Sequence, residues 1–97
     1  MLEAELLPRA RQDFTESYAW YCVQSERAAD RFDEFINKAI ETLCRNSNLG
    51  IRIDDEHRFY GIKKSFPFYL VYRTEPAKIL VVAIAHNSRE PGYWKVR

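Results

Sequence analysis

One continuous apolar run restricts the folds available to this chain. Residues 79–85 read ILVVAIA, and polar residues lie on both sides of the run. A short run rich in isoleucine and valine, bounded in this way, is typical of a strand that is buried on both faces of a sheet. We therefore expect a central strand from Lys78 to His86, around which the other elements are arranged.

A polar cluster follows the predicted central strand. It contains His86 and Arg89, after which a proline and a glycine turn the chain toward Tyr93 and Trp94. The strand thus places a histidine and an arginine at one edge of the sheet, and two aromatic residues can fold back beside them. We expect the functional site of the protein, which we call its working end, to lie here.

Two amphipathic helices are expected ahead of the sheet, after a short strand from Leu2 to Leu7. Pro8 ends that strand and can open a helix, because proline is tolerated in the first helical turn. The segment from Arg9 to Gln24 has apolar residues at helical spacing. Ser25 interrupts the pattern and is a suitable N-cap for a second helix, which ends near Asn46. The apolar stripe of that helix is the most regular in the chain and is expected to be buried: Ala28, Ala29, Phe32, Phe35, Ile36, Ala39, Ile40 and Leu43.

Three antiparallel strands complete the predicted fold. Residues 57–65, 66–74 and 78–86 are rich in aromatic and β-branched residues, and turn residues separate them. Residues 49–56 are expected to form a loop. The result is one domain over residues 1–97 of the α+β class, with the order β-α-α-β-β-β. A helical hairpin packs on one face of a small, mostly antiparallel sheet, and the other face is partly open.

The distribution of charge bears on the kind of partner, and the cysteines bear on the cellular compartment. Residues 1–50 hold nine acidic and six basic residues, whereas residues 51–97 hold five acidic and nine basic residues. The C-terminal half is the more suitable face for an acidic partner or nucleic acid, although a solvated sheet face explains the same residues equally well. Cys22 and Cys44 have neither zinc-site nor disulfide spacing and are expected to be buried thiols in a reducing cytoplasm. The sequence shows no secretion signal and no apolar run long enough to cross a membrane.

Catalytic motifs are scarce in this sequence. The sequence lacks a metalloprotease HExxH, a nucleophile elbow and a phosphate-binding loop, and two histidines are too few for a histidine metal site. We therefore expect no metal and no cofactor. His86 can act as a general base near neutral pH, but such a histidine also fixes loops by hydrogen bonding. Arg89 can bind a phosphate or a carboxylate. Tyr93 and Trp94 can stack on a base or anchor the tail by packing.

Basic residues also lie along the predicted sheet. Lys63 and Lys64 are adjacent, so they point to opposite faces of a strand, and Arg58 and Arg73 add further positive charge. These residues either bind a partner or form a solvated surface.

Two motifs and the order of elements resemble the RelE/ParE toxin superfamily. The first motif is FPxxxxYR, from Phe66 to Arg73, and the second is HxxRxPxYW, from His86 to Trp94. The segment from Ala10 to Tyr21 is also similar to the ParE-like branch, which is associated with plasmid stabilisation. The resemblance covers nearly the whole chain and implies the α+β fold described above.

The resemblance implies a cytoplasmic toxin of a type II toxin–antitoxin system. Such a toxin is neutralised by a cognate antitoxin, with which it can form a hetero-oligomer. ParE-like members poison DNA gyrase, whereas RelE-like members cleave mRNA on the ribosome. We expect the ParE-like activity, exerted by binding. The alternatives are a ribosome-dependent endoribonuclease and a non-toxic member that only binds its antitoxin.

The cationic residues of the RelE branch are largely missing here. That branch places lysines at alternate positions of the strand after the helices, an arginine at the start of the next strand and another after the last strand. When the sequences are aligned through residues 70–72, the corresponding positions are Tyr60, Ile62, Tyr69 and one near Asn87, and only a tail tyrosine, Tyr93, keeps its type. RelE-type catalysis is therefore disfavoured, but a different nuclease set remains open: His86, Arg89, Lys64 and Tyr93.

The residues expected to bind partners lie on the sheet and in the C-terminal cluster. An apolar surface is expected on the open sheet face, lined by Tyr60, Ile62, Tyr69 and Val71. We expect the antitoxin to cover this surface or an adjacent groove between the helices and the sheet. Arg89 is expected to be the functional charge, with His86 orienting it or the loop. The full set is Arg58, Tyr60, Ile62, Lys64, Tyr69, Arg73, His86, Arg89, Tyr93 and Trp94.

Overall fold

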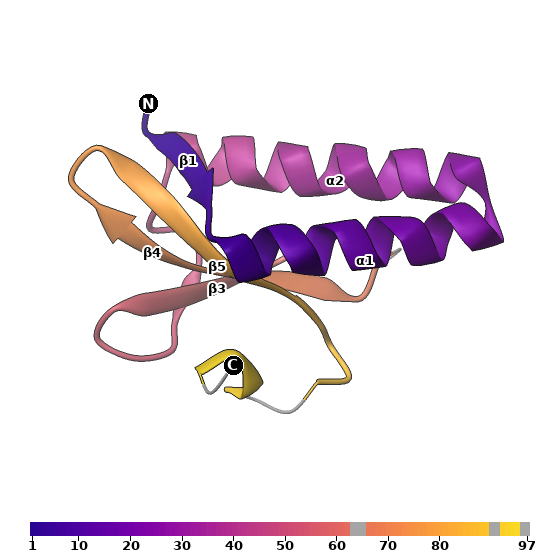
Figure 1. Ribbon diagram of the computed structural model, residues 1–97. Coiled ribbons are helices and arrows are strands. Elements are labelled where there is room, and N and C mark those ends of the chain that lie inside the picture. The colour runs from indigo at the N-terminus through magenta and orange to yellow at the C-terminus, as the bar shows by residue number, and fades with distance from the viewer. Residues whose placement is uncertain (63–65, 90–91, 96–97) are drawn as a thin grey trace.

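The computed structural model describes residues 1–62, 66–89 and 92–95. Within these ranges, a five-stranded sheet carries two helices on one face and a short 3-10 helix on the other (Figure 1). The order across the sheet is β1-β5-β4-β3-β2, with β1 parallel to β5 and the other neighbours antiparallel. The predicted α+β class is confirmed. The elements are β1 (Glu3–Leu6), α1 (Pro8–Gln24), α2 (Glu26–Arg45), β2 (Ile51–Arg52), β3 (His57–Gly61), β4 (Phe68–Glu75), β5 (Lys78–His86) and the 3-10 helix η1 (Tyr93–Lys95).

A single residue separates the two helices. Ser25 has extended backbone angles, and its Oγ accepts the main-chain N–H of Ala28 at 3.3 Å, so it caps α2 as the sequence predicts. The N–H of Ser25 also donates to the carbonyl oxygen of Tyr21 at 2.7 Å and closes the last turn of α1. So short a connection makes the two helices antiparallel neighbours, and Figure 1 shows them side by side over the sheet.

The main core lies between the helical hairpin and the sheet. Phe32, Ile36 and Leu43 of α2 are fully buried, which confirms the predicted stripe at these positions. Ala28, Phe35 and Ile40 are only half-buried, contrary to the prediction. They lie on the flank of the stripe, where the Phe35 ring meets Phe66 with centroids 5.3 Å apart. The sheet side of this core comes from residues of β4 and β5 that face the helices: Phe68, Leu70, Tyr72, Ile79, Val81 and Ile84.

The strand register divides the predicted open-face residues between the two sides of the sheet. Tyr60 lies opposite Leu70, and both belong with the helix-side core, as does Ile62. Tyr69 and Val71 point to the other side, because successive residues of a strand alternate between faces. The prediction that these four residues line one surface is therefore wrong. The face of each residue depends on the pairing of β3 with β4, which the sequence pattern alone does not reveal.

The second face of the sheet is covered in part by the C-terminal segment. Trp94 of η1 is buried and packs with Val71 and Ala83. Figure 1 shows η1 on the side of the sheet away from the helices. A β-bulge lies beneath it, because Val71 pairs with Ala83 whereas the next residue, Tyr72, pairs with Val81. Of the two roles that the sequence leaves open for Trp94, the structure shows packing against the sheet.

The segment predicted as a loop, residues 49–56, contains a short strand. Ile51 and Arg52 form β2 and pair with Phe59 and Arg58 of β3. Two residues are too few to show the alternation by which strands are recognised in a sequence, so the prediction of a simple loop is wrong at this point.

The two cysteines differ in their surroundings. Cys44 is buried, as predicted, but Cys22 is exposed near the end of α1. The described part of the chain contains no helix that is both long and apolar enough to span a bilayer. It also contains no group of three or more histidine, cysteine or carboxylate side chains suited to holding a metal ion.

Candidate functional site

A tight turn holds His86 at the end of β5. The N–H of Arg89 donates to the carbonyl oxygen of His86 at 3.0 Å, and the N–H of Ser88 donates to His86 Nδ1 at 3.0 Å. Because Nδ1 accepts this bond, Nε2 carries the proton of the neutral ring. The imidazole also stands edge-on to Phe68, with centroids 5.1 Å apart. The ring is thus fixed in orientation while its residue stays exposed.

Arg89 and Tyr93 meet beyond this turn. The Arg89 guanidinium carbon lies 5.1 Å from the centroid of the Tyr93 ring, within the range of a cation–π contact. Together with His86 they line a cavity of about 500 Å³ between α1 and the end of β5, which we call the α1 cavity. The structure therefore brings together three of the predicted site residues.

The opposite wall of the α1 cavity comes from the first helix. Asp13 Oδ2 accepts the main-chain N–H of Ile84 at 3.0 Å. β1 pairs with β5 only as far as Val81, so this carboxylate takes the place of a strand partner for Ile84. Glu16 lines the same wall, and so does Trp20, whose residue is 60% exposed. The α1 cavity thus sets acidic and aromatic side chains against His86 and Arg89.

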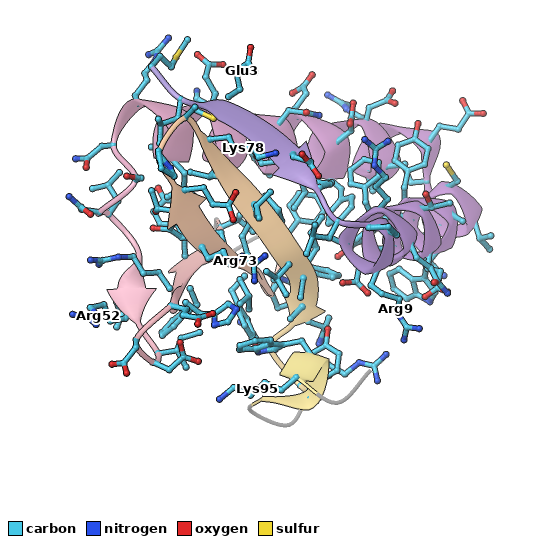
Figure 2. All side chains as sticks on the ribbon, turned by 60° about the vertical axis from the view of Figure 1, so that its left-hand side comes forward. Glu3, Arg9, Arg52, Arg73, Lys78 and Lys95 are labelled. Atoms are coloured by element: carbon cyan, nitrogen blue, oxygen red, sulfur yellow. The ribbon has the colours of Figure 1, made fainter. Side chains whose placement is uncertain are left out.

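A second cavity lies on the other face of the sheet, and we call it the sheet cavity. It has a volume of about 590 Å³ and is lined by residues of β2, β3, β4 and the C-terminal segment. Arg89 borders both cavities. Figure 2 shows two cations beside this region, Arg52 at the free edge of the sheet and Lys95 on η1. Trp94 forms part of the lining, although it is mostly buried.

The turn between β2 and β3 is bound to η1 through one carboxylate. Hydrogen bonds from the N–H groups of Glu56 and His57, together with the His57 ring, lower the pKa of Asp54 from 3.8 to about 2. Lys95 Nζ lies 3.7 Å from the same carboxylate. The His57 ring packs on Trp94 with centroids 4.8 Å apart. These contacts therefore hold the turn between β2 and β3 against η1.

The remaining predicted partner residues are spread over other parts of the molecule. Arg58 is engaged in the fold, because its Nη1 donates to the carbonyl oxygen of Gly50 at 2.8 Å. Tyr60 and Ile62 border a groove of about 250 Å³ between α2 and β3, the α2 groove. Arg73 lies on the second face, where its buried Nε finds no hydrogen-bond partner among the described residues and lies 3.9 Å from a Glu75 oxygen. Lys64 and its neighbour Lys63 fall outside the described residues.

Several residues of the two cavities escape sequence reasoning. Asp13 and Trp20 belong to a helix whose pattern indicates only a core-facing stripe, and Arg52 lies in a segment predicted as a loop. Phe59 of β3 carries no motif. Only Trp20 offers a signal in the sequence, because it is a large apolar residue that lies outside the helical stripe. Tertiary contacts, not local patterns, bring these side chains to the cavities.

Comparison with known proteins assigns this arrangement to a family. Residues 4–91 match the family model described as the ParE toxin of the type II toxin–antitoxin system parDE. The chain is also 33% identical over 88 residues to the protein named Toxin RelE3 from Caulobacter vibrioides, an alignment that covers 90% of this chain and 96% of the relative.

A solved structure shares the fold. The chain resembles one in the chromosomal ParDE toxin–antitoxin system from P. aeruginosa, with a TM-score of 0.75 and 19% sequence identity. The likeness covers 89% of this chain and 96% of the other chain. At that identity, the likeness shows the arrangement of helices and strands alone.

Proposed function

Because this chain belongs to the ParE family of type II toxin–antitoxin toxins, we propose that it inhibits DNA gyrase by binding and that a cognate antitoxin neutralises it. The family match over residues 4–91 is the observation that carries the proposal. Binding is favoured over RelE-type cleavage because Tyr60, Ile62 and Tyr69 occupy positions where that branch has cations. The toxin acts in the cytoplasm, where its target is found.

The working end of the toxin is the exposed side of the α1 cavity. Arg89 is exposed and contacts the Tyr93 ring, so its guanidinium group is available to a partner. His86 precedes it in a turn that fixes both residues. An exposed arginine that makes such contacts contributes little to stability, which makes it suited to a functional role.

The antitoxin covers the exposed apolar end of α1 beside the α1 cavity, at a distance from Arg89 along the wall. Trp20 and Val23 are 60% and 84% exposed there, and exposed apolar side chains next to a cavity are typical of a surface that a partner buries. The toxin–antitoxin hetero-oligomer should therefore be more soluble than the toxin alone. Equal solubility and equal thermal stability with and without the neighbouring gene product would argue against this assignment.

Inducible expression in bacteria tests the proposed target. DNA cleavage and mRNA integrity are measured in the same cultures after induction. Filamentation with broken DNA and intact mRNA is expected for a gyrase poison. Rapid translation arrest with cleaved mRNA would replace the proposal with a ribonuclease, for which His86→Gln should stop cleavage while substrate binding persists. Normal growth would indicate a member that only binds its antitoxin.

Three variants test the working end. Arg89→Ala should abolish toxicity while the melting temperature and antitoxin binding stay close to those of the wild type. Arg27→Ala, which removes an exposed arginine that lines none of the three cavities, should remain toxic. Trp94→Ala should lower the melting temperature, because it removes a buried aromatic side chain. Full toxicity of Arg89→Ala would show that Arg89 is not the functional charge.

A further inference from the structure

The end of β5 has a free edge in the α1 cavity. β1 runs parallel to β5 and pairs with it only as far as Val81, whose carbonyl oxygen accepts the N–H of Leu7 at 3.0 Å. Pro8 then starts α1. Within the part of the chain that the structure describes, β1 is the only strand on this side of β5. Beyond Val81, β5 therefore borders the α1 cavity instead of a strand.

The main-chain groups at the end of β5 point toward this free edge. The N–H of Ile84 points away from β4, because it donates to Asp13. In an antiparallel pair, the N–H and C=O of one residue point the same way, and the direction reverses at the next residue. The carbonyl oxygen of Ile84 and the N–H of His86 therefore both point toward the cavity. Asn87 supports this alternation, because its N–H donates to the carbonyl oxygen of Pro67, next to β4, at 2.7 Å.

An acceptor and a donor spaced in this way match the pairing of a parallel strand. In a parallel ladder, a residue donates its N–H to the carbonyl before its partner and accepts the N–H after that partner. Ile84 and His86 flank Ala85 in this manner. One residue of an added segment can therefore pair with Ala85, in the direction that β1 takes along β5. Adding a strand to a free sheet edge is a common way in which proteins bind extended peptides.

The α1 wall of the cavity favours a cation. Glu16 and Trp20 are exposed and lie one helical turn apart on this wall, and Asp13 adds a second carboxylate. Glu16 accepts a hydrogen bond from Gln12 at 2.9 Å, and a carboxylate can accept several more. Arg89 lies on the opposite wall. A basic side chain that enters the cavity can therefore pair with Glu16 and lie against the Trp20 ring.

We propose that the α1 cavity binds an extended segment of the target protein, with one residue paired to Ala85 and an adjacent arginine or lysine held by Glu16 and Trp20. Side chains alternate between the faces of a sheet, and Ile84 faces the helices. The residue paired with Ala85 therefore turns its side chain away from the helices, and its two neighbours turn theirs toward α1. The proposal rests on the working end proposed above and adds the chemistry that it recognises.

Blocked pentapeptides test the strand pairing on the purified full-length chain. The probes consist of threonine and valine, with an arginine in the fourth position and acetylated and amidated ends. The amide proton of His86 should shift downfield in the NMR spectrum of the labelled protein, because it gains a hydrogen bond. The amide proton of Asn87, which is already bonded to Pro67, should move little. The cavity volume of about 500 Å³ suits the few residues that make these contacts.

N-methylated forms of the peptide distinguish pairing from non-specific adhesion. A methyl group on the nitrogen of the third residue removes the donor to the Ile84 carbonyl and should weaken binding about tenfold. A methyl group on the arginine nitrogen, which points away from β5 in the same register, should change binding little. The two peptides are isomers, so they match in charge and apolar area.

Glu16→Gln tests the selection of a cation. The wild type should bind the arginine peptide about three- to tenfold more tightly than the same peptide with citrulline, its neutral analogue. Glu16→Gln should lose most of this preference and keep the shift of the His86 amide. The matched control is Glu34→Gln, which removes an exposed carboxylate that lines none of the three cavities and should keep the preference. Melting temperatures verify that both variants are folded.

The peptide results decide the inference whatever protein the toxin inhibits. No shift of the His86 amide, equal effects of the two N-methyl groups, or an unchanged preference in Glu16→Gln would overturn it. The same shift of His86 in the complex with the antitoxin, or on raising the concentration of the toxin alone, would assign the edge to the antitoxin or to a second copy and would overturn the assignment to the target.

Overlapping peptides from DNA gyrase test the two proposals separately. A basic gyrase segment that binds and shifts the His86 amide would support both. Binding of the model peptides without binding of any gyrase segment would support the peptide site and count against gyrase as the target.

Discussion

The hydroxyl oxygen of Tyr72 lies 2.9 Å from the main-chain nitrogen of Gly50, although 22 residues separate them in the sequence. The same hydroxyl donates to the carbonyl oxygen of Ser47 at 2.7 Å, and Tyr72 is fully buried. One side chain of β4 therefore satisfies two main-chain groups of the segment that follows α2. This contact fixes the position at which the chain enters β2.

Gly50→Ala should destabilise the fold. A Cβ atom at residue 50 would lie 2.5 Å from Tyr72 Oη and 2.9 Å from the carbonyl oxygen of Phe59, and the main-chain oxygen cannot move away without disturbing β3. We expect a loss of about 1–3 kcal/mol, as for overpacking at a buried site. The control is Gly61→Ala, because a Cβ there meets no described atom within 4 Å. Urea unfolding measures both, and equal stability of the two variants would contradict this account.

Asp13→Ala should weaken the C-terminal part of β5. It removes the acceptor of the Ile84 N–H, and an unsatisfied, partly buried donor costs about 1–3 kcal/mol. Asp13→Asn keeps an amide oxygen at the same position and should recover most of the loss. Hydrogen exchange of the Ile84 amide should be faster in Asp13→Ala than in Glu16→Ala, which changes the same wall of the cavity. Unchanged exchange would mean that this hydrogen bond does not protect the strand.

Phe32→Ala and Phe35→Ala should differ in their effects on stability. Phe32 is fully buried and lies 5.1 Å from Phe68, centroid to centroid, so its truncation should cost about 3–5 kcal/mol. Phe35 is half-buried at the flank of the core, and its truncation should cost less, about 1–2 kcal/mol on an area basis. Denaturant unfolding of both variants decides the ranking, and a larger loss for Phe35→Ala would reverse the burial order given above.

Acid should weaken the turn between β2 and β3. Folding lowers the pKa of Asp54 from 3.8 to about 2, so its carboxylate stabilises the folded state fully above the higher value. That contribution is lost as the pH falls from 3.8 toward 2. The difference in melting temperature between the wild type and Asp54→Ala should therefore shrink over this interval. Asp55→Ala controls for the loss of a neighbouring carboxylate, and a difference that stays constant would exclude this role for Asp54.

Local signals in the sequence account for much of the fold. The apolar run of β5, the proline at the start of α1 and the Ser25 cap each act within a few residues, so their consequences can be predicted without knowing the rest of the structure. β2 and the faces of Tyr60 and Tyr69 could not be predicted in this way. They depend on which residues of neighbouring strands lie opposite each other, and that register is set by the folded sheet.

The candidate site also combines residues that local sequence signals predict with residues that only the folded structure brings together. His86, Arg89 and Tyr93 lie close together in the sequence, and the turn after β5 brings them to one cavity. The opposing wall comes from Asp13 and Trp20, which are far away along the chain. The second cavity likewise depends on the return of Trp94 to the sheet. A sequence motif can therefore indicate the site residues that lie close together in the sequence. The site residues that come from distant parts of the chain can be identified only in the folded structure.

The parallel pairing of β1 with β5 has a consequence for the order in which the protein can fold during synthesis. Glu3 pairs with Lys78 and Leu6 pairs with Val81, so β1 can pair only after β5 has been synthesised. Contacts between such distant residues form late, because closing a long loop costs entropy before any contact is gained. A nascent chain that stops before residue 78 has both helices but lacks the strand at the centre of the sheet. The sheet of the toxin domain can therefore be completed only after β5 has been synthesised.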